Sequence, residues 1–338
     1  MIKKIFYVLL GACIVLGSCS TGEAAASAVA KMLRGSSQAL LFLGCRAVSE
    51  NEVEFTFSQP VTVKYLSFEP VVTIASIENG STVKVRLENN PGPGVQITAD
   101  LLAEDMEKNT INVLIPFRSR NNRMPSLVIN ELRTEHSNPR AEFIEFKALT
   151  AGNLGGMRVF ILGNTNASKE TIYEFFPVEV KKDEYMVLHL RTVEPSSRDE
   201  YGDNLAESGG RDSSPAARDF WIPGNTKLVH RSATTVYVLD QDDRVLTAVM
   251  ISENTDPWWN KDYFAEAAAF LHKQGAWKSA DGGIGGPADA VRSTGTTNTR
   301  TICRDETGEN TNTAADWYIT ATSGATPGTT NNPRRYVP

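Results

Sequence analysis

The chain has 338 residues, which is enough for about two domains of roughly 150 residues each. Hydrophobic residues make up 41% and charged residues 22%, so the composition is that of a folded soluble protein and not of a disordered one. The formal net charge is −6, and it becomes −8 without residues 1–18, which carry Lys3 and Lys4 and no acid. This acidic balance argues against a nucleic-acid-binding surface, which needs clustered lysine and arginine.

Residues 1–18 have the layout of a secretory signal peptide, with two lysines, an apolar run over 5–16 and small residues after it. The ending Leu16-Gly17-Ser18-Cys19 resembles the bacterial lipobox, in which cleavage precedes a cysteine that then carries lipid. The alternative is an ordinary cleaved signal with an unrelated cysteine. The resemblance implies export and a membrane anchor at Cys19, because more than one acyl chain gives stable anchoring. Ser20 is not the aspartate that retains many lipoproteins in the inner membrane, so the outer membrane or cell surface is preferred.

Residues 19–39 are small and polar, which predicts a flexible tether. Two further cysteines remain in the mature chain, Cys45 and Cys303. Export permits a disulfide between them, but sequence does not fix their distance, so a disulfide and two free thiols both stay open. No Cys/His spacing suggests zinc, and we expect no cofactor.

Residues 40–117 predict a small β-sandwich, because short runs of alternating or β-branched residues are separated by turn-forming residues. The expected strands are 53–57, 61–66, 71–77 and 83–87, and the expected turns are 58–60, 69–70, 79–80 and 89–94. The closing stretch 95–117 resembles the last strands of bacterial immunoglobulin-like surface modules, with an acidic turn at 105–109. That turn is interpreted as solvated surface, with a calcium site as the alternative. Residues 118–125 are basic and polar and predict a linker whose three arginines are solvated.

Residues 126–332 predict a second, larger β domain, followed by a short tail at 333–338. The expected strands are 127–132, 141–146, 155–164, 171–180, 184–190, 234–240 and 244–252, with a hairpin turn at 241–243. Because successive side chains of a strand face opposite ways, Ile144 and Phe146 are the expected inward pair. Glu142 shares their face, where we expect it to bond to backbone or an arginine.

The first and last segments of this region carry a set of motifs in a fixed order. The opening strands contain Asn130-Glu131 and Glu142-Phe143-Ile144-Glu145, and the closing segment contains Arg300, Asp316-Trp317 and Pro327-Gly328 followed by Asn331. These motifs resemble those of the lamin-tail domain family, an immunoglobulin-like β-sandwich found in nuclear lamins and many exported bacterial proteins. The expected fold class is therefore mainly β, with two immunoglobulin-like sandwiches in tandem and a helical insertion in the second. The resemblance implies that Glu131, Glu142 and Glu145 are structural carboxylates; a metal or acid/base cluster is the alternative.

Two insertions interrupt the second domain. Residues 191–220 are polar and predict a long surface loop, whose acids Asp199, Glu200, Asp203 and Glu207 are solvated or, alternatively, hold a cation. Residues 256–277 contain Trp258-Trp259 and a predicted helix over 263–272. The two tryptophans either pack on the sandwich or form an exposed patch that binds a glycan or protein. Residues 281–298 are glycine-rich and predict a flexible segment.

No catalytic motif is evident in the sequence. The four histidines, His136, His189, His230 and His272, form no HxH or HxxxH pair, and there is no GxSxG or P-loop. We therefore expect a lipid-anchored envelope protein that acts as a non-catalytic binding or scaffolding module. Its expected partners are the membrane, through the anchor, and an envelope or extracellular protein or glycan, with no nucleic acid. The alternatives are an envelope hydrolase, which needs the acids of 131–145 or 199–207 to converge, and an architectural spacer.

Overall fold

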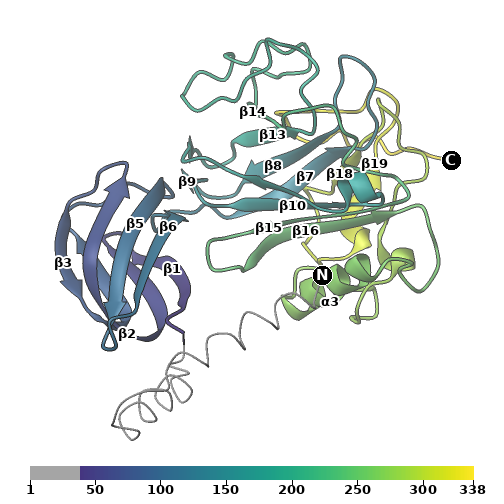
Figure 1. Cartoon of the computed structure of the whole chain (residues 1–338). Helices are drawn as coiled ribbons and strands as arrows, with labels where there is room; N and C mark the ends of the chain where they lie inside the picture. The colour runs from purple at the N-terminus through teal and green to yellow at the C-terminus, as the bar shows by residue number, and fades with distance from the viewer. Residues whose placement is uncertain (1–38) are drawn as a thin grey trace, which may run out of the picture.

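The computed structural model describes residues 39–338 and shows a mainly β protein built from four sheets (Figure 1). The predicted signal peptide, the predicted lipidation site Cys19 and most of the predicted tether lie outside these residues. Within the described part, none of the helices combines the length and the apolar character that a membrane span requires.

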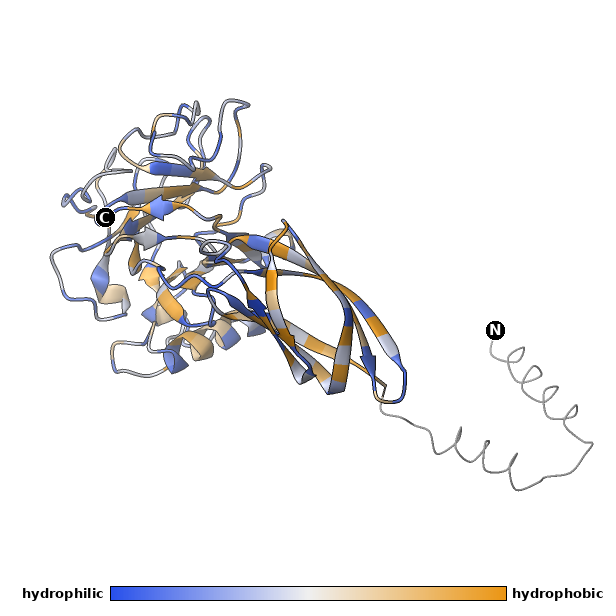
Figure 2. Cartoon of the chain, turned by 90° about the vertical axis from the view of Figure 1, so that its left-hand side faces the viewer, coloured by the Kyte–Doolittle hydropathy of each residue, from blue (hydrophilic) through white to orange (hydrophobic). Residues whose placement is uncertain are grey.

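The N-terminal sheet is antiparallel and has the strand order β3-β4-β2-β5-β6, with β1 paired to β2. Its strands are β1 (Phe42–Ser49), β2 (Glu52–Glu69), β3 (Ile74–Glu78), β4 (Gly80–Leu87), β5 (Gln96–Asp105) and β6 (Thr110–Arg118). Hydrophobic and polar residues alternate along these strands (Figure 2), and β1 also lies against β6, so the sheet curls around its apolar face. That face forms a core centred on Phe55, Val83 and Leu101.

Two sequence predictions for this sheet are wrong. Residues 53–57 and 61–66 belong to one long strand, β2, because the chain passes Ser58–Pro60 as an irregularity in register without turning. The turn at 105–109 does join β5 to β6, but Asp105 is buried and not solvated. Its carboxylate accepts hydrogen bonds from the backbone N–H groups of Glu107 and Asn109 and from the side chain of Gln59.

The C-terminal body contains two larger sheets with a shared core between them. The six-stranded sheet has the order β14-β13-β8-β7-β18-β19, and the five-stranded sheet has the order β11-β10-β15-β16-β17. The six-stranded sheet comprises β7 (Leu127–Arg133), β8 (Phe143–Ala148), β13 (Tyr185–His189), β14 (Arg218–Trp221), β18 (Ile302–Arg304) and β19 (Trp317–Ile319). The five-stranded sheet comprises β10 (Arg158–Gly163), β11 (Thr171–Glu174), β15 (Ala233–Leu239), β16 (Val245–Ser252) and β17 (Val291–Arg292). A two-stranded sheet pairs β9 (Gly152–Asn153) with β12 (Glu179–Val180), so the single strand predicted for 171–180 is divided in two.

The predicted inward pair on β8 is confirmed. Ile144 and Phe146 lie in the core between the sheets, and β7 contacts β16 across it. Phe143 points to the opposite face, where it is also buried, in a small cluster with Val187 and Ala217. Both faces of the six-stranded sheet are therefore covered at this strand, the outer face by the segment that leads into β14.

The predicted helix is confirmed as α3 (Asp262–Lys273), whose buried face consists of Phe264, Ala267, Ala268 and Leu271. The prediction that 281–298 is flexible is wrong. This segment contains the 3₁₀ turn η2 (Pro287–Asp289) and strand β17, which runs parallel to β16. The buried Ser293 donates a hydrogen bond to the carbonyl oxygen of Arg231 at 2.5 Å, so distant residues hold the segment in place.

Residues 118–125 join the two bodies, and their arginines are ion-paired; the prediction of solvated side chains is wrong for the half-buried Arg118 and Arg120 and holds for the exposed Arg123. Arg118 pairs with Glu174, Arg120 pairs with Asp242 at 2.6 Å, and Arg123 pairs with Glu179 at 2.5 Å. All three acids belong to the C-terminal body.

Two glycines allow the backbones of the two bodies to touch at this joint. A Cβ atom on Gly94 would lie 2.3 Å from the backbone of Gly155, and Gly94 has φ +65°. Gly92 in the same loop has φ +98°, but a Cβ there would meet only a side-chain methyl of Val95 at 3.4 Å. The two positions therefore share a backbone conformation that favours glycine, and only Gly94 also needs the space.

We predict that Gly94→Ala loosens the joint, while Gly92→Ala does not. Both variants carry a similar backbone strain, but only G94A forces the facing backbones apart, a distortion of about 1–3 kcal/mol. Small-angle X-ray scattering should show a larger radius of gyration for G94A and an unchanged one for G92A. Equal radii for the two variants would show that the contact does not hold the bodies together.

Candidate functional site

Glu131 and Glu145, two carboxylates singled out in the sequence, lie opposite each other on β7 and β8 and are fully buried. Glu131 accepts hydrogen bonds from the backbone N–H of Thr326 at 3.1 Å and from the hydroxyl of Thr301. Glu145 accepts one from the backbone N–H of Gly328 at 2.7 Å. The closing segment of the chain is thus bonded to the two opening strands of the body.

Asn130 and Asn331 complete this arrangement, which we call the tail network. The amide of Asn130 donates to Glu145 at 2.9 Å, and that of Asn331 donates to the carbonyl oxygens of Asn130 and Arg304 at 3.0 and 2.9 Å. Gly328 has φ +85°, and a Cβ there would lie 2.7 Å from the backbone of Ala216. The opening and closing motifs therefore act as one structural unit.

The electrostatics of the tail network follow from its burial. Burial raises the pKa of Glu131, and burial together with the neighbouring Glu131 raises the pKa of Glu145 well above its usual range. The third carboxylate, Glu142, lies apart and pairs with Arg191 through two contacts of 2.6 and 2.5 Å, as the sequence led us to expect. In residues 39–338 no three His, Cys, Asp or Glu side chains are grouped to hold a metal ion.

The acids of the 191–220 insertion do not gather at one point either. Glu200 is buried and accepts hydrogen bonds from the backbone N–H groups of Ser208 and Asp219, whereas Asp203 and Glu207 are exposed. Asp199 accepts from the backbone of Trp221 at 2.7 Å. The prediction of a solvated surface loop is therefore wrong for Asp199 and Glu200, which hold the insertion in shape.

A buried charged cluster that the sequence reasoning missed fixes this insertion to the sheet. His189 on β13 bonds to Asp219 through Nε2 at 2.8 Å, and its Nδ1 lies 3.7 Å from Asp212, too far for a hydrogen bond. Arg133 on β7 pairs with Asp212 at 2.8 Å, and Trp221 stacks on the imidazole with ring centroids 3.7 Å apart. Burial lowers the pKa of His189, but the two aspartates raise it by more, so the net pKa is raised. The residues of this cluster come from distant segments, so no local spacing in the sequence could have revealed the cluster.

The other motif residues and histidines also have local structural partners. The Arg300 guanidinium lies 4.4 Å from the ring centroid of Tyr336, and Trp317 pairs with Arg304 between β18 and β19. His136, His230 and His272 each bond to a nearby oxygen, at 2.9, 2.8 and 3.1 Å. The carbonyl oxygen of Pro327 accepts a hydrogen bond from Ser214 at 3.1 Å.

Cys45 and Cys303 are both free, so the option of a disulfide between them is excluded. Burial raises the pKa of Cys45 to about 12 and raises that of Cys303 further. Both thiols are therefore protonated at neutral pH and are weak nucleophiles.

The two adjacent tryptophans of the second insertion have different environments. Trp258 is 79% exposed. Trp259 packs against Phe264 of α3 with ring centroids 5.3 Å apart, and its indole N–H donates to the carbonyl oxygen of Gly285 at 3.0 Å. The packing interpretation is therefore confirmed for Trp259, and Trp258 has the exposure that the binding interpretation requires.

Trp259 also lines a pocket of about 280 Å³, which we call the Trp259 pocket. Its other lining residues are Asn164, Ser232, Ala233, Ser252, Glu253, Asn254, Asn260 and Pro287. The side-chain oxygen of Asn164 is buried without a hydrogen-bond partner, and its amide nitrogen donates to Ser232 at 2.9 Å. Glu253 is already paired with Arg231. The pocket thus combines an aromatic wall with neutral hydrogen-bonding groups, one of which needs a donor.

Comparison with known proteins adds a family to this geometry. A family model described as TP_1001_2nd, protein second domain, matches residues 125–319. The chain belongs to that family. A relative from Treponema pallidum (strain Nichols), described as an uncharacterized protein, is 29% identical over 215 residues, which cover 61% of this chain and 53% of the relative. The chain therefore spans about half the length of the curated relative it matches.

The matched region of this TP_1001 second-domain family begins just before β7 and ends with β19, so it includes β7, β8 and both insertions. Among solved structures, the N-terminal part of the bacterial S-layer protein SbsC is similar over 67% of this chain and 47% of its own, with 13% identity and a TM-score of 0.25. At that TM-score the similarity supports no conclusion about fold or function.

We predict unequal costs for two isosteric substitutions of buried carboxylates. Glu142→Gln leaves Arg191 buried without its charge partner and should cost about 3–5 kcal/mol. Glu145→Gln leaves one acceptor oxygen for the two donors, Asn130 and Gly328, but it also removes the repulsion from Glu131, so it should cost less, about 1–2 kcal/mol. Urea unfolding of both variants measures the difference, and a larger loss for E145Q would show that Glu145 is needed as an anion.

The pH dependence of the same variants gives a second readout. Because folding raises the pKa of Glu145, its stabilising effect is complete below the unfolded pKa of about 4.3 and is lost as pH rises through the raised folded pKa. E145Q has no proton to lose, so between about pH 4.3 and the raised folded pKa its stability should fall less steeply than the stability of the unchanged protein.

Proposed function

We propose that the protein is an exported, lipid-anchored protein of the bacterial envelope, with two immunoglobulin-like β-sandwiches of which the second is a lamin-tail domain. The lipobox-like Leu16-Gly17-Ser18-Cys19 supports the anchor. The tail network supports the lamin-tail assignment, because the opening and closing motifs that suggested it bond directly to each other. The outer membrane or cell surface is the proposed location.

We further propose that the protein is a non-catalytic binding module and that its ligand is a glycan. The single observation that carries this proposal is Trp258, a large aromatic side chain that is 79% exposed and directly precedes Trp259, the aromatic wall of a neutral polar pocket. Sugars present C–H faces that pack on aromatic rings and hydroxyl groups that bond to amides. Asn164 offers a buried acceptor with no donor, and the exposed Asn260 makes no hydrogen bond in the part of the chain that the structure describes.

The hydrolase alternative has less support. It requires acids from 131–145 or 199–207 to converge in one cavity. Glu131 and Glu145 instead face the donors of the tail network, Glu142 faces Arg191, and Glu200 faces backbone N–H groups. None of them lines the Trp259 pocket.

We predict that Cys19→Ser abolishes lipid attachment and leaves the signal segment uncleaved. Without the thiol there is no site for lipid attachment. The signal segment is then not removed, and the variant remains a precursor. Metabolic labelling with a clickable palmitate analogue should mark the unchanged protein and not C19S, with Cys45→Ser as the matched cysteine control. Labelling of C19S would show that the lipid is attached to another residue and would overturn the assignment of Cys19.

We predict that Trp258→Ala weakens glycan binding at least about tenfold, because a central aromatic contact is worth more than about 1.4 kcal/mol. The full protein in detergent micelles is screened on an array of bacterial and host glycans, and hits are measured by calorimetry. Tyr65→Ala removes an exposed aromatic from the N-terminal sheet and should leave binding unchanged.

The outcomes of this screen separate the remaining alternatives. If no glycan binds but a protein partner is captured in a Trp258-dependent manner, the ligand class is wrong and the binding role stands. If neither is found, the architectural spacer replaces the binding module.

A further inference from the structure

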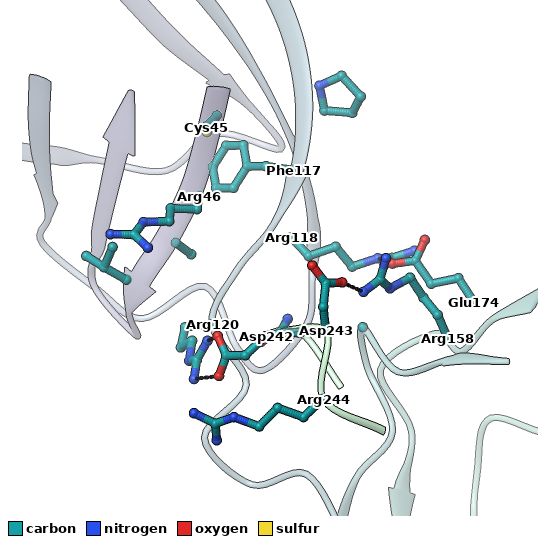
Figure 3. A pocket seen from close by; sticks show the side chains of 15 residues that line it. Cys45, Arg46, Phe117, Arg118, Arg120, Arg158, Glu174, Asp242, Asp243 and Arg244 are labelled. Carbon is teal, nitrogen blue, oxygen red and sulfur yellow. Dashed lines mark hydrogen bonds and ion pairs between the residues drawn. The ribbon is translucent and has the colours of Figure 1, made fainter. Parts of the chain in front are cut away.

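A second pocket lies at the joint between the two bodies, shares no lining residue with the Trp259 pocket, and has a volume of about 930 Å³ (Figure 3). Cys45, Arg46 and Phe117 of the N-terminal sheet line one wall. Arg158 and the β15–β16 turn with Asp242, Asp243 and Arg244 line the other. We call it the joint cleft. Its volume lies at the upper end of the range typical of small-molecule sites, about 300–1,000 Å³.

The joint cleft is rich in arginine although the protein as a whole is acidic. Its lining contains five arginines, at 46, 118, 120, 158 and 244, and three carboxylates, at 174, 242 and 243. Three of the arginines are paired with these carboxylates: Arg118 with Glu174, Arg120 with Asp242, and Arg158 with Asp243. Two positive charges therefore remain without a carboxylate partner in the lining.

Those two charges belong to Arg46 and Arg244. Arg46 pairs with Glu54 at 3.0 Å, but its side chain is 77% exposed, and an exposed pair of this kind is weak. Arg244 donates its backbone N–H to Asp240, and within residues 39–338 its guanidinium has neither an ion pair nor a hydrogen bond. Both can therefore turn to an incoming anion at little cost.

The guanidinium groups of Arg46 and Arg244 both influence one carboxylate of the cleft, Asp242. The pKa of Asp242 is lowered, first by its hydrogen bonds with Arg120 and also by the charges of Arg244 and Arg46. Figure 3 shows Arg46 and Arg244 on opposite sides of the Arg120–Asp242 pair. Three arginines thus surround one carboxylate, and they come from β1, the joint segment and the β15–β16 turn.

We propose that the joint cleft binds a small polyanion, with phosphate or carboxylate groups held by Arg46 on one body and Arg244 on the other. Guanidinium groups bind such oxyanions through paired N–H donors. A ligand with at least two anionic groups matches this arrangement, because the lining offers one guanidinium group without a lining carboxylate partner on each wall. Since each wall belongs to a different body, the bound ligand also stiffens the joint. This site is independent of the glycan proposal, which concerns another surface.

The test is calorimetric titration of the full protein in detergent micelles with two probes, inorganic tripolyphosphate and citrate, at low ionic strength. Arg46→Gln and Arg244→Gln should each weaken binding at least about tenfold. Arg334→Gln makes the same change in net charge at an exposed side chain outside the cleft and should change binding by less than about twofold. Thermal unfolding of each variant should match the unchanged protein, because the three side chains are exposed.

The two probes identify the anionic group. Preference for tripolyphosphate assigns phosphate, and preference for citrate assigns carboxylate. Added salt should reduce the affinity, since exposed charges are screened. Absence of binding by both probes, or equal weakening by R334Q, R46Q and R244Q, would overturn the proposal.

Discussion

The structure of the C-terminal body depends on two buried carboxylates, Glu131 and Glu145. A buried carboxylate is costly unless donors surround it. The donors here are the backbone N–H groups of Thr326 and Gly328, so the end of the chain must return to the strands where the body begins. At Gly328 the return leaves no room for a side chain. Burial raises the pKa of both acids, and the neighbouring Glu131 contributes to the rise at Glu145. This constraint fixes the ends of the sandwich and leaves the segments between them free to extend.

The binding role that we propose belongs to the two insertions more than to the sheets. Binding residues are commonly carried by segments that a rigid scaffold positions. The 191–220 insertion is held by the His189 cluster on the outer face of the six-stranded sheet, where it buries its own polar groups and closes that face. The second insertion instead directs Trp259 inward and Trp258 outward. One anchored aromatic and one free aromatic give a surface that is both fixed in place and available to a ligand.

The sequence predicted the elements whose evidence is local. Alternation over 83–87 predicted β4, the strand-forming run over 234–240 predicted β15, and helix propensity over 263–272 predicted α3. Predictions failed where distant partners decide the outcome. Polar composition predicted a solvated surface loop at 191–220 and a flexible segment at 281–298. Glu200 instead accepts hydrogen bonds from the backbone of Asp219, 19 residues further along the insertion, and Ser293 bonds to the distant Arg231. The sequence identified the tryptophan pair, but it did not predict that Trp259 packs inward and Trp258 stays exposed. The His189 cluster and the joint cleft left no pattern in the sequence, because their residues come from distant segments.

The joint between the bodies shows how a net acidic chain can hold a locally positive site. Each arginine of the joint segment, residues 118–125, forms an ion pair with a carboxylate of the C-terminal body. Gly94 allows the backbones of the two bodies to lie in contact beside these pairs. The pairs use up three acids near the joint. What remains there is the positive charge of Arg46 and Arg244 at an open cleft. The contacts that fix the orientation of the two bodies therefore also set the charge of the cleft between them, which makes orientation and anion binding parts of one equilibrium.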